Sequence, residues 1–103
     1  MDSLNQEIDS ITQKLIRDYK PQKIILFGSG AKGKTGPTSD IDMLIIKKTR
    51  KRFVDRIGEV LNLVDSTRLE PLVYTPQELQ SRLAIQDFFI NEVLKTGKTL
   101  YAK

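Results

Sequence analysis

The sequence contains no cysteine and no histidine. Without cysteine there is neither a disulfide framework nor a thiolate metal site. Without histidine the chain lacks the commonest general base and the usual nitrogen ligand of zinc. Any catalysis must therefore use carboxylates, hydroxyls, lysine, arginine or tyrosine, and a bound metal is expected to be a hard, oxygen-liganded ion such as Mg²⁺.

The sequence also lacks long hydrophobic runs. No apolar run approaches the roughly 20 residues of a membrane-spanning helix, and the N-terminus lacks the apolar core of a secretory signal. These absences predict a cytoplasmic protein with no membrane partner. The length predicts a single domain over residues 1–103 and leaves a homo-oligomer open.

The chain is basic, with a net charge of +4 from 17 Lys and Arg against 13 Asp and Glu. This balance suits a polyanionic partner such as a nucleotide, a nucleic acid or an acidic protein. A cationic surface is also common in proteins that bind none of these, so charge alone does not select a partner.

Apolar periodicity and turn residues predict four helices and three strands. The predicted helices cover 3–19, about 50–64, a segment starting at Thr75 and Pro76, and about 86–96; the predicted strands cover 23–27, 41–46 and 68–74. This order predicts an α/β (α+β) fold in which helices pack on a small mixed β-sheet.

Individual residues predict further local features. Pro71 lacks an N–H donor, so its strand is expected to have a bulge or a partly unpaired edge. Thr75 and Glu78 are predicted to form a capping box, Gly97 to end the last helix, and residues 99–101 to dock as a short tail. The second helix is expected to bury one apolar face, which comprises Phe53, Val54, Ile57, Val60, Leu61 and Val64.

A pair of carboxylates opens the second strand, in the sequence Ser39-Asp40-Ile41-Asp42. Side chains alternate along a strand, so Asp40 and Asp42 are expected on the same face, roughly 6–7 Å apart. Such a pair suits divalent cations in phosphoryl or nucleotidyl transfer. The alternative is that Asp40 caps a turn and Asp42 is an exposed strand residue.

A glycine-rich connection lies between the two strands. Gly28 would let a phosphate approach the backbone, and Ser29 offers a hydroxyl and an N–H to phosphate oxygens. The alternative is an ordinary turn after a strand.

The same connection matches the P-loop pattern of ATPases through Gly28, Gly33, Lys34 and Thr35. That motif requires a helix to begin at its Lys-Thr, whereas Gly36-Pro37 follows here. We therefore favour coincidence over a P-loop NTPase. ATPase activity that is lost in Lys34→Ala and retained in Asp42→Ala would reverse this choice.

A third carboxylate, Glu70, lies on the strand that follows the second helix. A right-handed crossover would place this strand near Asp40 and Asp42. Glu70 would then complete a metal site or act as a general base. The alternative is an exposed edge-strand residue beside Pro71.

Two surface features remain without an assigned role. The basic run 47–52 would suit a nucleic acid, although such runs are more often solvated loops. Phe88, Phe89 and Ile90 occur in succession, so some of them are expected either in the core or exposed to a partner protein.

Together these motifs resemble the minimal nucleotidyltransferase domains of the DNA polymerase β-like superfamily. The family pattern is Gly-Ser, a connection of about this length, and Ser-Asp-x-Asp at the start of a strand, with a third acid on a later strand. Gly28-Ser29, residues 39–42 and Glu70 match it. The resemblance extends from the first helix to the segment 97–101.

The resemblance implies a polymerase β-like nucleotidyltransferase fold and transfer of a nucleoside monophosphate, AMP from ATP, to an acceptor. Asp40, Asp42 and Glu70 would be catalytic and would hold Mg²⁺, as one ion or two. The nucleotide would be bound by Gly28, Ser29, Lys32 and Ser39. Small members of this family are often antitoxins beside a helical HEPN toxin, which implies a partner protein as acceptor.

The chain departs from the family at three positions. One is Glu70, where the third acid of the family is more usually Asp. Members often carry Arg directly after Gly-Ser and again two residues later, where this sequence has Gly30 and Lys32. Lysine supplies a point charge in place of a bidentate phosphate donor. This leaves open a weak or inactive nucleotidyltransferase that neutralises a toxin by binding alone.

Overall fold

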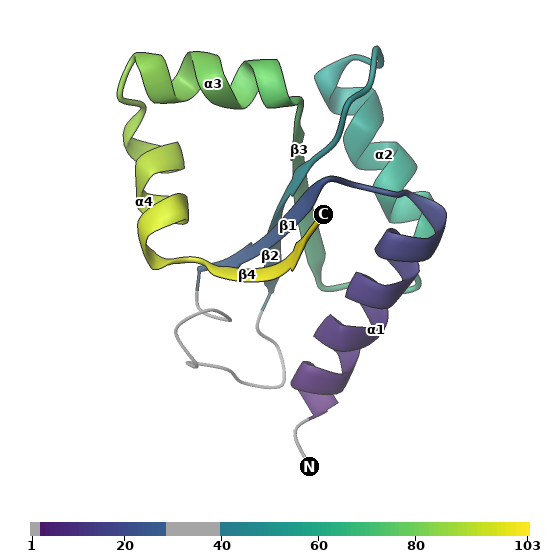
Figure 1. Ribbon diagram of the computed structural model, residues 1–103. Helices are drawn as coiled ribbons and strands as arrows, with labels where there is room; N and C mark the ends of the chain where they lie inside the picture. The colour runs from purple at the N-terminus through teal and green to yellow at the C-terminus, as the bar shows by residue number, and fades with distance from the viewer. Residues whose placement is uncertain (1–2, 29–39) are drawn as a thin grey trace.

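The computed structural model describes residues 3–28 and 40–103 of the chain (Figure 1). These residues form four helices and four strands. They are α1 (Ser3–Asp18), β1 (Lys23–Phe27), β2 (Ile41–Ile46), α2 (Phe53–Leu63), β3 (Leu69–Tyr74), α3 (Pro76–Ala84), α4 (Phe88–Thr96) and β4 (Lys98–Ala102). The expected α+β fold is confirmed.

The strands form one mixed sheet in the order β3-β2-β1-β4. β1 pairs antiparallel with β2 and with β4, whereas β2 pairs parallel with β3. The parallel pair is joined through α2, as expected for a strand–helix–strand crossover. The expected neighbourhood of the strands that carry Asp42 and Glu70 is therefore confirmed.

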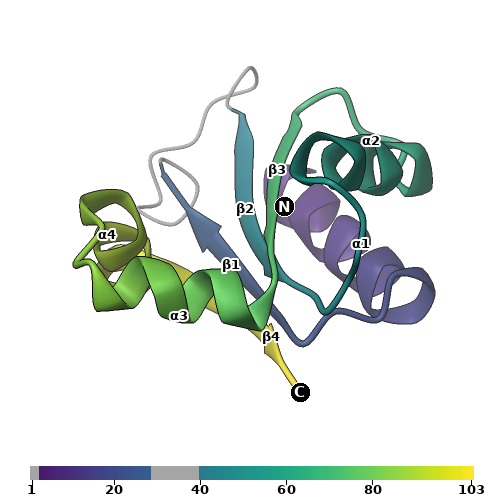
Figure 2. The ribbon, with the colours of Figure 1, turned by 90° about the horizontal axis from the view of Figure 1, so that it is seen from above.

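The sheet separates two pairs of helices, with α1 and α2 on one side and α3 and α4 on the other (Figure 2). Alternating residues of β2 enter the two cores: Ile41, Met43 and Ile45 pack with α1 and α2. Leu44 and Ile46 pack with Ile90 and Val93 of α4. Because side chains alternate, Asp42 lies on the same face as Leu44, the face of α3 and α4.

The C-terminal segment was predicted as a short docked tail, but it is the edge strand β4, paired with β1. Gly97 connects α4 to this strand with an extended backbone at φ −74° rather than a left-handed turn. A Cβ at Gly97 would lie 2.7 Å from Ile25 Cγ2 and closer still to the Val93 carbonyl oxygen. Glycine is therefore required here by close packing.

The expectation for Pro71 is confirmed in one of its two forms, because Pro71 lies on the edge strand β3, which pairs with β2 in continuous register. The predicted inward face of α2 is right only in part, because Val60 and Val64 are buried but Val54 is 64% exposed. Arg56, which was not predicted to face inward, is 6% exposed. The helix is rotated so that Arg56 and Val60, one turn apart, face inward.

Within residues 3–28 and 40–103, no helix combines the length and the apolar character that crossing a membrane requires.

Candidate active site

Strand pairing brings three of the predicted site residues together at one end of the sheet. Phe27 pairs with Asp42 across β1 and β2, which places Gly28 beside Asp42. Asp42 in turn pairs with Glu70 across β2 and β3. Asp40 directly precedes β2 and is exposed, as is Glu70, whereas Asp42 is half-buried.

The environment of Asp42 raises its pKa to about 6 from an ordinary 3.8. Burial is the largest cause, followed by a hydrogen bond with Glu70 and by the negative charges of Glu70 and Asp40. Two carboxyl groups can share a hydrogen bond only when one holds a proton. Among the described residues, every cause acting on Asp42 raises its pKa, and no cation lowers it.

Gly28 has a left-handed backbone with φ +74°. A Cβ at this position would lie 2.5 Å from Asp42 Oδ2. Glycine is therefore needed both for the turn and for the close approach of the backbone to the carboxylate.

Gly28→Ala is expected to lower the free energy of unfolding by about 1–2 kcal/mol because of the left-handed conformation. The added methyl group would also displace the Asp42 carboxylate. Urea denaturation measures the first effect and nucleotide binding the second. Gly58→Ala is the control, because nothing lies within 4 Å of a Cβ at Gly58; that variant should be at least as stable as the wild type because alanine favours helix.

An aromatic contact fixes α4 against this end of the sheet. The rings of Phe27 and Phe89 meet edge to face with centroids 5.5 Å apart. Phe27 immediately precedes Gly28, so the contact supports the turn from the side of α4. Of the three successive apolar residues in α4, Ile90 is buried, and Phe88 is the most exposed at 81%.

The chemistry of the acids fits a hard cation. Asp40, Asp42 and Glu70 offer only oxygen ligands, which suit Mg²⁺. A cation would also relieve the repulsion that raises the pKa of Asp42. As they stand, no three acidic side chains in the described ranges are gathered closely enough to hold a metal ion. The metal role of these residues therefore stays a prediction.

The other predicted nucleotide-binding residues lie between the described ranges. Ser29, Lys32 and Ser39 fall within 29–39, as do Lys34 and the rest of the P-loop match after Gly28. Their assignments remain predictions from sequence.

The pKa of Asp42 predicts how stability depends on pH without metal. The folded chain holds this proton up to about pH 6, while an unfolded chain releases it near 3.8. The folded state therefore binds more protons between these values, and the Asp42 contribution to stability falls as the pH rises through about 6. Urea denaturation in EDTA at about pH 5 and about pH 7.5, compared between wild type and Asp42→Asn, isolates this contribution. An unchanged difference between the two proteins would contradict it.

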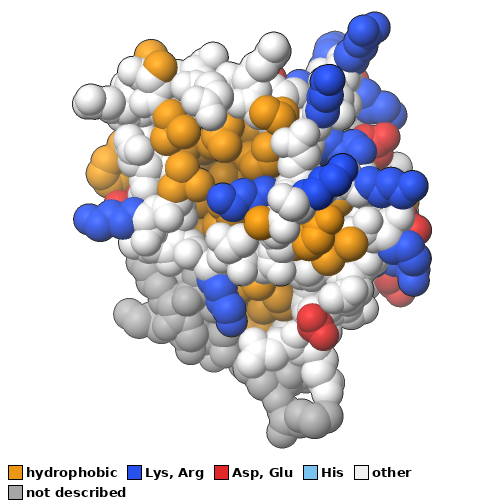
Figure 3. All heavy atoms as spheres, viewed as in Figure 1, with side chains coloured by type: hydrophobic (Ala, Val, Ile, Leu, Met, Phe, Trp, Pro, Cys, Tyr) orange, Lys and Arg blue, Asp and Glu red, His pale blue; other side chains and the backbone are white. Residues whose placement is uncertain are grey.

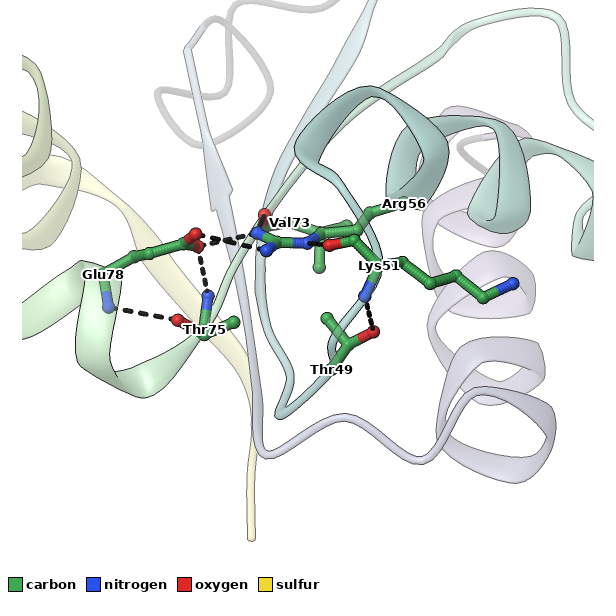
Figure 4. Close-up of polar contacts among 6 residues, drawn as sticks. All are labelled: Thr49, Lys51, Arg56, Val73, Thr75 and Glu78. Carbon is green, nitrogen blue, oxygen red and sulfur yellow. Dashed lines mark hydrogen bonds and ion pairs between the residues drawn. The ribbon is translucent and has the colours of Figure 1, made fainter.

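A buried network towards the opposite end of the sheet from the acids was not predicted from the sequence (Figure 4). Arg56 of α2 donates from Nη1 to the Val73 carbonyl oxygen at 3.1 Å and from Nε to the Lys51 carbonyl oxygen at 2.8 Å. Its guanidinium also makes a fork with Glu78, at 2.6 Å and 3.1 Å. The network thus ties α2 and the end of β3 to the start of α3.

Glu78 takes part both in the capping box of α3 and in the contact with Arg56. It accepts a hydrogen bond from the Thr75 backbone N–H, and its own N–H donates to Thr75 Oγ1, which confirms the predicted capping box. Hydrogen bonding from Arg56 is the main reason that the pKa of Glu78 is lowered. The sequence did offer one signal of this network, because Arg56 lies one helical turn before Val60 and so on the same face of α2. A charged residue is rarely assigned to a core, however.

The Gly28 turn beside Asp42, with Glu70 on the adjacent strand, has the order of residues on which the resemblance to polymerase β-like nucleotidyltransferases was based. The chain belongs to the family described as Polymerase beta, Nucleotidyltransferase, whose family model matches residues 9–103. A comparison with curated proteins gives no match.

Two solved structures share the fold. One is a Sulfolobus solfataricus protein assigned as a nucleotidyltransferase, with a TM-score of 0.66 and 21% identity over 95% of this chain and 79% of that one. The other is a chain of a toxin–antitoxin structure with AMP-PNP, with a TM-score of 0.58 and 24% identity over 92% of this chain and 73% of that one.

Proposed function

We propose that the protein is a Mg²⁺-dependent nucleotidyltransferase that transfers AMP from ATP to a hydroxyl group of a partner protein. The observation that carries the proposal is the pairing of Asp42 with Glu70 on adjacent parallel strands, directly beside the Gly28 turn. Membership of the nucleotidyltransferase family supports the same reaction class.

The roles follow from position and exposure. Asp40 and Asp42 would hold Mg²⁺, as one ion or two, and Glu70 on the adjacent strand would be the third oxygen ligand. Bound Mg²⁺ would neutralise charge on the triphosphate and on the leaving pyrophosphate. Gly28, Ser29, Lys32 and Ser39 would bind the triphosphate.

The transfer step would be an in-line substitution at the α-phosphorus of ATP. The acceptor hydroxyl oxygen forms a bond to the α-phosphorus of ATP, the bond from that phosphorus to the α,β-bridging oxygen breaks, and pyrophosphate leaves. We assign the hydroxyl proton to Glu70, because Glu70 is exposed at the end of the sheet whereas Asp42 is half-buried.

We infer that the acceptor is a toxin of the HEPN type in the same cytoplasm, which makes this protein an antitoxin. The toxin–antitoxin structure with AMP-PNP, which has the same fold, supports both the nucleotide and the kind of partner. The exposed Phe88 side chain at the junction of α3 and α4 would offer an apolar contact to a protein acceptor.

A second candidate is an antitoxin that acts by contact alone. Gly30 and Lys32 stand where family members often carry arginine, so two strong phosphate donors are absent from the sequence. In this case the fold would bind the toxin and transfer nothing.

Labelled ATP tests the proposal directly. The protein is incubated with Mg²⁺ and the product of the neighbouring gene, with the label on either the α- or the γ-phosphate. AMP transfer predicts that only the α label appears on the acceptor. A γ label on the acceptor would indicate a kinase, and absence of both labels with intact neutralisation would favour contact alone.

A further inference from the structure

Positive side chains gather at the end of the sheet opposite the carboxylates. They come from the start of β1, from the segment after β2 and from the residue after β4. We call this surface the basic edge, and it comprises Lys20, Lys23, Lys48, Arg50 and Lys103. Figure 3 shows Lys and Arg side chains gathered over the β2–α2 connection and beside the C-terminal end of β4.

Backbone hydrogen bonds hold the three segments next to one another. Gln22 N–H donates to the Ile46 carbonyl oxygen at 2.8 Å, and Lys103 N–H donates to the Gln22 carbonyl oxygen at 2.9 Å. Lys47 N–H donates to the Tyr74 carbonyl oxygen at 3.0 Å. The fold itself therefore brings the cations together.

The charges of the basic edge are uncompensated within the described residues. The ion pairs in the described part of the chain involve other cationic side chains, such as Lys51 with Glu59 and Arg52 with Asp55. None includes a member of the basic edge. All five members are exposed except Lys23, which is half-buried.

A hollow of about 760 Å³ opens within this surface. Lys48 and Arg50 line it together with hydroxyl and amide side chains. The complete lining is Gln22, Lys48, Thr49, Arg50, Thr75, Pro76 and Gln77. It contains no acid, so it offers hydrogen-bond donors and positive charge to an anion.

We propose that the basic edge binds the phosphodiester backbone of a nucleic acid. Neighbouring strands lie about 4.8 Å apart, so the ends of β2, β1 and β4, which carry the basic edge, span about 10 Å, enough for two consecutive phosphates. A protein partner is less well matched, because protein interfaces have an apolar centre in which charges are depleted. The exposed apolar residues Ile85 and Phe88 lie instead at the junction of α3 and α4.

This surface is a second site, distinct from the proposed transfer site. Lys48 lies six residues after Asp42 along β2 and its extension, which corresponds to about 20 Å. A strand held at the basic edge would not be placed as the acceptor. The inference therefore goes beyond the proposed transferase and stands without it.

Fluorescence anisotropy with labelled single-stranded RNA tests the inference, with single-stranded and double-stranded DNA of the same sequence as further probes. The logarithm of the wild-type binding constant should fall linearly with the logarithm of salt concentration, with a slope of about −0.7 per neutralised phosphate on a single strand. Lys48→Ala/Arg50→Ala should weaken binding at low salt by at least about tenfold and make the slope shallower by about 1.4. Lys20→Ala/Lys103→Ala should act in the same direction.

The matched control is Lys95→Ala/Lys98→Ala, which removes the same charge from exposed positions on α4 and β4. This variant, and Asp42→Asn, should bind within about twofold of the wild type, because their changes lie away from the basic edge. Thermal melting checks that Lys48→Ala/Arg50→Ala is folded. We expect it to be, because Lys48 and Arg50 make no side-chain hydrogen bond or ion pair within the described residues.

Equal weakening by the control variant would overturn the inference in favour of general charge attraction. Failure to bind any of the three nucleic acids would also overturn it. Binding of polyglutamate instead, sensitive to Lys48→Ala/Arg50→Ala, would identify the basic edge as a surface for an acidic protein. Comparison of the three probes identifies the strand type that the surface prefers.

Discussion

Asp42→Asn is expected to reduce AMP transfer by roughly a thousandfold or more, the scale of losing a positioned catalytic group. Asparagine keeps the shape of the side chain and removes the charge that would hold Mg²⁺. The same variant should be more stable than the wild type in EDTA at neutral pH, because the repulsion from Glu70 and Asp40 is removed. Steady-state transfer assays and urea denaturation measure the two effects in one pair of proteins.

The matched control is Asp55→Asn, which removes one negative charge from an exposed surface pair with Arg52. Surface pairs contribute at most about 1 kcal/mol, so transfer and stability should both stay near wild type. If transfer persists in Asp42→Asn, the catalytic assignment is wrong. If the wild type transfers nothing and both proteins neutralise the toxin, contact alone accounts for the function.

Glu78→Ala is expected to lower the free energy of unfolding by about 3 kcal/mol. Two losses add together: the capping box with Thr75, and the counter-charge of Arg56, whose side chain is only 7% exposed. A buried guanidinium without its carboxylate is costly, while its bonds to the Val73 and Lys51 carbonyl oxygens remain. Urea denaturation measures the change.

A double-mutant cycle with Arg56→Met separates the two losses. The double variant should cost at least about 1 kcal/mol less than the sum of the single variants, because the second substitution removes the unpaired buried charge. Strict additivity would show that Glu78 acts only as a cap. Because the pKa of Glu78 is lowered, its stabilising contribution should be present above pH 4.5 and be lost as the pH falls further.

Local patterns in the sequence were sufficient to predict much of the fold. The ranges 23–27 and 41–46 are strands as predicted, since each is a short apolar run bounded by polar or turn residues. The capping box at Thr75 and Glu78 depends only on neighbours three residues apart. The crossover through α2 then placed Glu70 beside Asp42, because parallel neighbours joined by a helix follow one handedness.

Features that depend on distant partners were not predicted. Lys98–Ala102 reads as a polar tail until β1 provides an edge with which it can pair. Arg56 reads as a solvent-facing residue until Glu78, 22 positions later, is known to reach it. In the site, the sequence indicated the acids, whereas the contact of Gly28 with the Asp42 carboxylate required the three-dimensional positions of two strands.

The central claim is that Asp40, Asp42 and Glu70 jointly hold a divalent cation together with a nucleotide. Crystals grown with Mn²⁺ and a non-hydrolysable ATP analogue test it through the anomalous signal of the metal. The account predicts a peak bonded to the Asp42 carboxylate and to at least one of the other two acids, with the triphosphate beside Gly28. A nucleotide and metal bound at Lys34 and Thr35, with no contact to Asp42, would contradict it.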